Sequence, residues 1–219
     1  MNSVRVMGVI CVLALATACT SPKPPQAPQE VGSPSSSPAP ATRAPGSGLQ
    51  DRMLSVAELP PGYSAVAIPN TSNAFTEGCP PLKQDFSYTE QAMVTFVGGV
   101  GASIAESLST TSAEVAKAQV ASVAELPQRC ARFGIDIGGI KGEITSAAVG
   151  VSALGEKRAA ARLTMVVTEF GSGLGGVHMH LVAVSAGPTL MVLTVADLTP
   201  IDATMVDSLT KRAWQKAAS

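Results

Sequence analysis

The chain has 219 residues, of which 46% are hydrophobic and 14% are charged. That balance excludes a chain that is disordered over most of its length. The 15 Lys and Arg residues nearly match the 16 Asp and Glu residues, so the charge predicts no binding to nucleic acid or to an anionic membrane surface.

Residues 1–18 resemble a secretory signal peptide. Arg5 gives a short positive segment, and the apolar run 6–16 is too short to cross a bilayer as a stable helix. Thr17 and Ala18 are small enough for a peptidase site, and the thiol of Cys19 can accept a diacylglyceryl group. The pattern resembles the lipobox of bacterial lipoproteins, with alanine in place of the commoner leucine three residues before the cysteine. An ordinary signal peptide followed by an incidental cysteine is the alternative.

Cys19 is therefore the predicted lipidation site and the first residue of the mature protein. Two or three acyl chains, such as palmitate, each gain about 0.8 kcal/mol per buried CH₂ and make the attachment effectively permanent. No second apolar run approaches the length of about 20 residues that spans a bilayer. We expect lipid alone to hold the protein on the extracytoplasmic face of the cell membrane. Loss of Arg5 reduces the 15 basic residues to 14 against 16 acidic ones, a net charge of −2.

Residues 19–47 are predicted to form a disordered tether. This segment consists mainly of Pro, Ser, Ala, Gln and Gly and holds half of the 16 prolines. It cannot bury a core, and it would reach roughly 85 Å as an extended polyproline helix or roughly 30 Å as a flexible coil. The remaining residues, 48–219, are enough for a single globular domain.

The first elements of the domain are short. A helical turn within 53–59 should end at the Pro-Pro-Gly corner 60–62, and a strand should follow over 63–68. Two strands over 92–97 and 102–109 are joined by a glycine-rich link, which predicts an antiparallel hairpin.

The longest helix should begin at a capping box in which Thr111 is the cap and Glu114 reaches back. Its apolar positions recur at helical spacing: Ala116, Val120, Val123, Leu126, Cys130 and Phe133. Pro127 should kink this helix or begin a second one, and Gly134 is the expected stop.

The C-terminal half alternates between apolar and polar residues over 161–168, which predicts a strand. A glycine loop then leads to a strand over 178–185, and a Gly-Pro turn leads to an unbroken apolar run, 190–193, that suggests a central strand. Asp202 should cap the last helix. The predicted fold class is α+β, an antiparallel β-sheet with helices packed mainly on one face.

Two cysteines remain in the mature domain, Cys79 and Cys130. In an exported chain they most simply form a disulfide. A buried pair of free thiols and a thiol catalyst are the alternatives, and the second would need a nearby base.

The lipobox, the tether, the Leu-Pro-Pro-Gly-Tyr opening 59–63 and a cysteine on either side of the start of the Ala-rich helix resemble mycobacterial envelope lipoproteins. More specifically, residues 53–219 resemble those similar to the extracellular sensor domain of PknH-type receptor kinases. The resemblance implies an α+β fold that binds a ligand or partner without catalysis. Sensor domains of that family are expected to bear two disulfides, whereas only Cys79 and Cys130 are available here.

Catalytic motifs are nearly absent from the sequence, so we predict no enzyme and no cofactor. Gly171, Gly173 and Gly176 match a dinucleotide fingerprint in form only, because a strand is expected after them where the phosphate site needs a helix. There is no Gly-x-Ser-x-Gly elbow, Walker loop or second cysteine pair at zinc spacing.

His178 and His180 lie two residues apart in a predicted strand, so both imidazoles should lie on one face. Two ligands are too few for a metal, and a third, such as Glu169 or Asp197, would have to come from a neighbouring strand. A pair of half-exposed polar residues is therefore the favoured interpretation, and no metal is predicted.

One sheet face mixes polar groups with an apolar floor, and we predict that it binds the ligand. Its polar members are Arg162, Thr164, Thr168, His178 and His180, and its apolar members are Val166, Val182 and Val184. Arg162 is the best candidate to bind an anionic or carbonyl-bearing ligand, because its guanidinium can bond two oxygens at once. Cover of this face by segment 70–86 is the alternative. The predicted function is a sensor-like module for a small molecule, lipid or envelope partner, and the second candidate is an adaptor that docks another envelope protein.

Substitution Cys19→Ala should move the full-length protein from the detergent phase to the aqueous phase of a detergent partition, because it removes the lipid. Cys11→Ala, which changes a cysteine within the signal peptide, is the matched control and should partition like the wild type. Equal partition of all three proteins would contradict the lipoprotein assignment.

Overall fold

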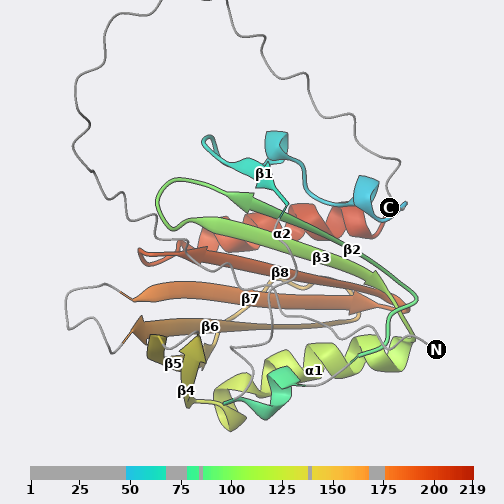
Figure 1. Ribbon diagram of the computed structural model, residues 1–219. Helices are drawn as coiled ribbons and strands as arrows, with labels where there is room; N and C mark the ends of the chain where they lie inside the picture. The colour runs from blue at the N-terminus through green and yellow to red at the C-terminus, as the bar shows by residue number, and fades with distance from the viewer. Residues whose placement is uncertain (1–47, 68–77, 84–85, 138–139, 168–175) are drawn as a thin grey trace, which may run out of the picture.

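The computed structural model describes residues 48–67, 78–83, 86–137, 140–167 and 176–219 (Figure 1). One antiparallel sheet of eight strands organises them, in the order β1-β2-β3-β8-β7-β6-β5-β4. The last strand in the chain, β8, lies between β3 and β7 and joins the two halves of the sheet. Among the described residues, no helix is both long enough and apolar enough to cross a membrane.

The strands are β1 (Ser64–Val66), β2 (Glu90–Val97), β3 (Ser103–Thr110), β4 (Arg132–Ile137), β5 (Ile140–Ala148), β6 (Lys157–Val167), β7 (Val177–Ala186) and β8 (Thr189–Asp197). The helices are α1 (Ala113–Arg129) and α2 (Ala203–Ala217), with the short 3₁₀ turns η1 (Gln50–Arg52), η2 (Val56–Glu58) and η3 (Pro80–Lys83). The predicted hairpin of β2 and β3, the turn between β7 and β8, and the Asp202 cap of α2 are confirmed.

The two long helices pack on opposite faces of the sheet (Figure 1). Side chains alternate along each strand, so Leu163 and Ala183 pack in the cluster of α1, while Val182 and Val184 pack in the cluster of α2. The antiparallel α+β architecture is as predicted. The expectation that the helices lie mainly on one face needs correction, because α1 packs on β5 to β8 of the expected face and α2 covers part of the other.

The central position of β8 explains why both faces are covered. Leu190, Met191 and Leu193 are each at most 1% exposed, and consecutive residues of a strand point to opposite faces. A strand that is apolar on both faces needs other elements packed against both of them. The buried stripe of α2, which includes Val206 and Leu209, provides the second cover.

The start of α1 differs from the predicted cap by one residue. The hydroxyl of Ser112, not Thr111, accepts from the backbone N–H of Val115 at 3.2 Å. The Thr111 hydroxyl instead donates to the carbonyl of Ser87 at 2.6 Å. Both residues can cap a helix, and a tertiary contact decided between them.

The end of α1 also differs from the prediction. The helix runs through Pro127 to Arg129, because a proline in the last turn removes only one hydrogen bond near the end of the ladder. Ser146 of β5 then donates to the carbonyl of Cys130 at 2.7 Å. The predicted helical Phe133 and the predicted stop Gly134 both belong to β4.

Cys79 and Cys130 form a disulfide, as predicted, with an S–S distance of 2.03 Å and a Cα–Cα distance of 5.5 Å. Both cysteines are buried in the cluster that α1 makes with the sheet. Gly78 lies so close to the backbone of Gly134 that a Cβ on it would be 2.6 Å from the carbonyl oxygen. The disulfide therefore ties η3 and its preceding turn to the end of α1.

The double substitution Cys79→Ser and Cys130→Ser should lower the free energy of unfolding by about 4 kcal/mol, because the bond closes a loop with a sequence separation of 51 residues. Urea titration of the oxidised wild type and the variant measures this difference. Dithiothreitol should lower the wild-type midpoint and leave the variant unchanged. A reductant effect of equal size in both proteins would contradict the prediction.

Candidate functional site

The candidate site lies on the α2 side of the sheet, beyond the part of β7 and β8 on which α2 packs. One row of cross-strand partners on this face comprises Thr145, Thr164, His178 and Asp197, from β5, β6, β7 and β8. In the next row, Arg162 of β6 lies opposite His180 of β7. We call the surface formed by Thr145, Arg162, Thr164, Val166, His178 and Asp197 the Arg162 face.

The predicted polar residues differ in exposure. Arg162 is exposed, and Thr164 and His178 are half-buried. His180 is only 6% exposed, so it presents little surface to solvent. Thr168, the fifth predicted residue, lies outside the described residues.

The predicted apolar floor is mostly covered. Val182 is 1% exposed and Val184 is 0% exposed, because α2 and the apolar side chains of loop 149–156 pack over them. Val166 alone of the three predicted valines reaches the surface, at 48% exposure. The candidate site is therefore smaller and more polar than the sequence suggested.

The alternative in which segment 70–86 covers this face is not supported by its described part. Within that segment, η3 packs against α1, on the other side of the sheet. Residues 70–77 and 84–85 lie outside the described residues.

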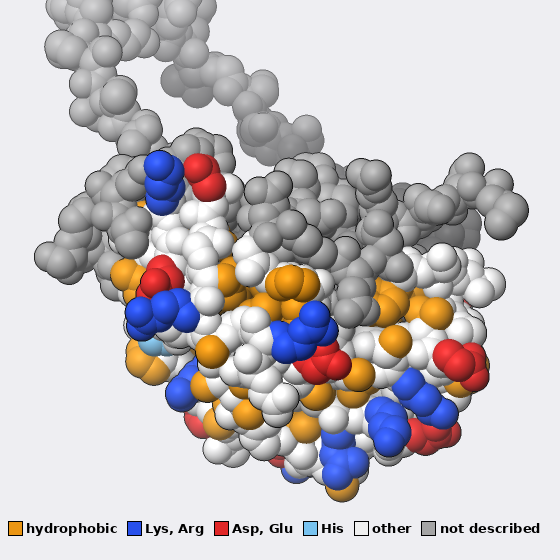
Figure 2. Space-filling model, turned by 90° about the horizontal axis from the view of Figure 1, so that it is seen from below, with side chains coloured by type: hydrophobic (Ala, Val, Ile, Leu, Met, Phe, Trp, Pro, Cys, Tyr) orange, Lys and Arg blue, Asp and Glu red, His pale blue; other side chains and the backbone are white. Residues whose placement is uncertain are grey.

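Two acidic side chains, Asp197 and Glu143, place negative charge on the Arg162 face. The carboxylate of Asp197 accepts from the backbone N–H of Thr199 at 2.8 Å and from its hydroxyl at 2.9 Å. Glu143 of β5 lies 3.3 Å from the guanidinium of Arg132. Figure 2 shows histidine surface beside basic and acidic side chains at one end of the molecule. Charges of both signs therefore lie within a short distance of one another.

The surroundings of His180 favour its neutral form. Burial is the main cause that lowers the pKa of His180 below its ordinary value of 6.5, followed by the positive charge of Arg162 and then by His178. A neutral imidazole both donates and accepts one hydrogen bond, so His180 can support either kind of neighbour at neutral pH.

The chemistry of this face is that of hydrogen bonding to a ligand. Arg162 and Thr164 supply donors, and Asp197 supplies an acceptor. Among the described residues, no group of three or more His, Cys, Asp or Glu side chains could hold a metal ion. Glu169, one of the suggested third ligands, lies outside the described residues.

The contribution of β5 was missed because the sequence analysis assigned no strand to 140–148. Ile144 is 1% exposed and points to α1, so Thr145 and Glu143 necessarily point to the Arg162 face. The β-branched residues Ile140, Ile144 and Thr145 gave a usable signal of a strand.

Comparisons with known proteins identify a fold but no family. No protein-family profile and no curated protein matches the chain. The extracellular domain of PknH from Mycobacterium tuberculosis superposes with a TM-score of 0.56 at 10% identity, covering 77% of this chain and 94% of that one. An uncharacterized protein from Mycobacterium smegmatis aligns at 10% identity over 72% of this chain and 92% of its own, with a TM-score of 0.39. The resemblance to the PknH-type sensor domain is therefore confirmed at the level of fold.

NMR titration of the two imidazoles tests whether burial and Arg162 lower the pKa of His180. We expect His180 to titrate below 6.5 in the wild type. Arg162→Gln should raise the pKa of His180 without restoring the ordinary value, because burial, the larger cause, remains. Arg158→Gln, an exposed change on the same strand, should leave it unaltered. An ordinary or raised pKa of His180 in the wild type would contradict this geometry.

Proposed function

We propose that this protein is a lipid-anchored, extracytoplasmic envelope protein whose domain binds a small molecule, a lipid or an envelope partner on the Arg162 face and performs no catalysis. One observation carries the proposal: polar side chains gather on a part of the sheet that α2 does not cover, in a fold shared with the extracellular domain of PknH.

The groups on this face suit a ligand with oxygen atoms and few net charges. The exposed guanidinium of Arg162 can bond two oxygens of a carboxylate, phosphate or carbonyl-bearing group. Thr164 and His178, in the next row, can orient a hydroxyl or carbonyl beside it. Asp197 provides an acceptor for a donor on the same ligand.

The place where the chain enters the domain supports the Arg162 face as the binding surface. Leu49 and Met53, the first buried residues after the predicted tether, pack in the cluster of α2. The chain therefore enters the domain on the side of the sheet that carries the Arg162 face. An anchor on Cys19 would place a domain with this entry point within reach of envelope lipids and proteins.

A second candidate is an adaptor that docks another envelope protein. The observation that favours it is Val166, an apolar side chain 48% exposed beside polar groups on a sheet surface. Apolar side chains with a polar surround are common in protein interfaces.

Native mass spectrometry of the protein purified from its own envelope tests the first candidate. We expect a copurifying molecule whose occupancy falls roughly tenfold or more in Arg162→Ala, because a charge-assisted hydrogen bond contributes about 1.5–3 kcal/mol. His178→Ala should also lower it. His178 is chosen because His180 is buried and its removal would disturb packing.

Arg158→Ala is the matched control, since it removes an exposed arginine from the same strand. Its occupancy should equal that of the wild type. If Arg162→Ala and His178→Ala both retain full occupancy, the Arg162 face is not the site. A bound protein in place of a small molecule or lipid would instead favour the adaptor.

A further inference from the structure

The core on the α2 side contains a carboxylate. Glu106 of β3 is 0% exposed and lies in a row of apolar neighbours, between Val94 of β2 and Leu193 of β8. One oxygen, Oε2, accepts from the backbone N–H of Leu54 at 2.7 Å. The other, Oε1, is buried with no hydrogen-bond partner. A buried carboxylate with one neutral donor is poorly compensated.

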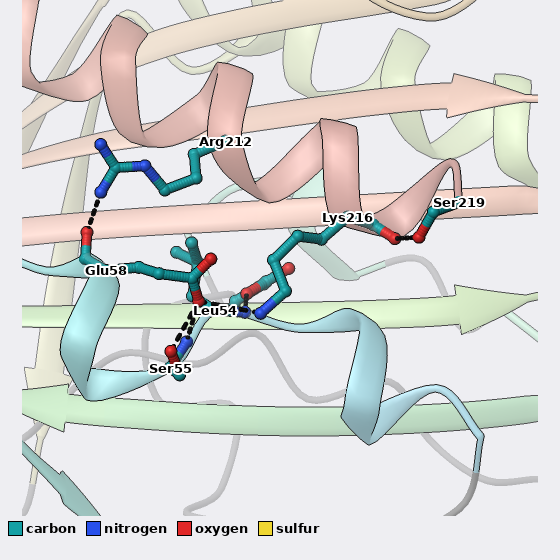
Figure 3. A network of polar contacts seen from close by, with 7 residues as sticks. Leu54, Ser55, Glu58, Arg212, Lys216 and Ser219 are labelled. Carbon is teal, nitrogen blue, oxygen red and sulfur yellow. Dashed lines mark hydrogen bonds and ion pairs between the residues drawn. The ribbon is translucent and has the colours of Figure 1, made fainter.

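Lys216, the cation that acts on Glu106 through space, pairs with another acid. The ammonium of Lys216, on α2, lies 2.8 Å from Oε2 of Glu58. The backbone N–H and hydroxyl of Ser55 donate to the same oxygen, each at 2.7 Å. Arg212 donates to the carbonyl of Glu58 (Figure 3). Lys216 and Arg212 of α2 are thus directed to Glu58, and Lys216 acts on Glu106 only through space.

Residues 49–59 form what we call the docking segment, which lies between β3 and the C-terminal end of α2. Leu49, Met53 and Leu54 are each 3–4% exposed and pack in the same cluster as Trp214. Arg52 of this segment donates to the carbonyl of Ala217, and its Nε is buried without a partner. The docking segment is also the first part of the domain after residues 19–47.

The contact between Leu54 and Glu106 couples the two elements. If the docking segment moves away, Glu106 loses its cover and its carboxylate can reach water. If the segment stays, an ionised Glu106 is held in an apolar environment beside the negative charge of Glu58. The bond from the Leu54 N–H favours the carboxylate, but burial is the larger influence on the pKa of Glu106. The docked state is therefore favoured by the neutral acid, and the open state by the carboxylate.

We infer that Glu106 is a pH-sensitive latch: the docking segment stays packed against β3 and α2 while the buried carboxyl is protonated, and ionisation of that carboxyl loosens the segment and with it the connection between the predicted tether and the domain. The charged groups that act on it are Lys216 of α2, which favours ionisation, and Glu58 of the docking segment, which opposes it. Arg52 and Arg212 bond backbone carbonyls instead.

The pH range follows from the burial. Burial is the main cause that raises the pKa of Glu106 from 4.5 to about 7 in the docked state. The docked form holds the Glu106 proton more tightly than the open form does. The stability that this proton adds to the docked state is therefore complete below pH 4.5 and is lost as the pH rises through about 7. Between pH 5.5 and 8.5 the opening equilibrium should shift about 30-fold toward the open state.

Hydrogen exchange of the full-length protein in detergent, with labelling times scaled to the intrinsic exchange rate at each pH, measures this opening. Protection of the docking segment should fall about 30-fold from pH 5.5 to 8.5 in the wild type. Glu106→Gln should remove the dependence, because the amide does not ionise. Glu156→Gln, an exposed change in loop 149–156, should behave like the wild type. Trp214, the one tryptophan of the chain, gives a fluorescence readout of the same cluster.

Glu58→Gln provides a second variant that does not alter the buried carboxyl. It removes the opposing negative charge and frees Lys216 to approach Glu106, so the midpoint of the pH dependence should move down. A wild type whose segment protection is independent of pH overturns the inference. So does loss of protection that extends equally to α1, or an unchanged midpoint in Glu58→Gln.

Discussion

The constraint on which the rest of the structure depends is the two-sided burial of β8. Leu190 and Val192 point to the α1 side while Met191 and Leu193 point to the α2 side, so the chain must supply a cover for each face. The disulfide and η3 fix α1 on the first, and the docking segment together with loop 149–156 extends α2 on the second. Among the described elements of this second face, α2 packs mainly on β7 and β8 rather than on β5 and β6. The polar side chains of the Arg162 face gather on the part of the sheet that α2 does not cover.

Glu106 is an exception to the apolar packing at the centre of the sheet. Its cross-strand partners on β2 and β8, Val94 and Leu193, are both apolar. Burying a carboxylate costs free energy that a leucine at the same position would not, and the single bond from Leu54 offsets only part of it. Local departures from good packing persist when another requirement favours them, and they concentrate at functional positions. Here the departure lies at the point where a segment next to the predicted tether meets the core. Its position links the packing of the sheet to the attachment of the domain.

The sequence predicted elements whose signal is local and missed those that tertiary contacts decide. Asp202 and the turn at Gly187 need only their neighbours, and both were predicted. The choice of Ser112 over Thr111 depended on the carbonyl of Ser87, far from the helix start in sequence. Alternation grouped Arg162 with His180 but could not reveal which parts of that face α2 would bury. The unbroken apolar run in β8 did indicate that both faces of that strand must be buried, and therefore that the second face also needs packed elements.

The charges of the Arg162 face indicate how it would recognise a ligand. Glu143 pairs with Arg132, and Asp197 adds a second negative charge to the face that carries Arg162; the whole chain has a net charge of −1. A nearly neutral surface neither concentrates nor repels ligands of one sign over long distances, so electrostatic steering contributes little. Selectivity must then come from the spacing of donors and acceptors, which the register of four paired strands holds rigid. Strands hold such groups more firmly than loops do, so binding of a ligand there would lose little conformational entropy in ordering the site.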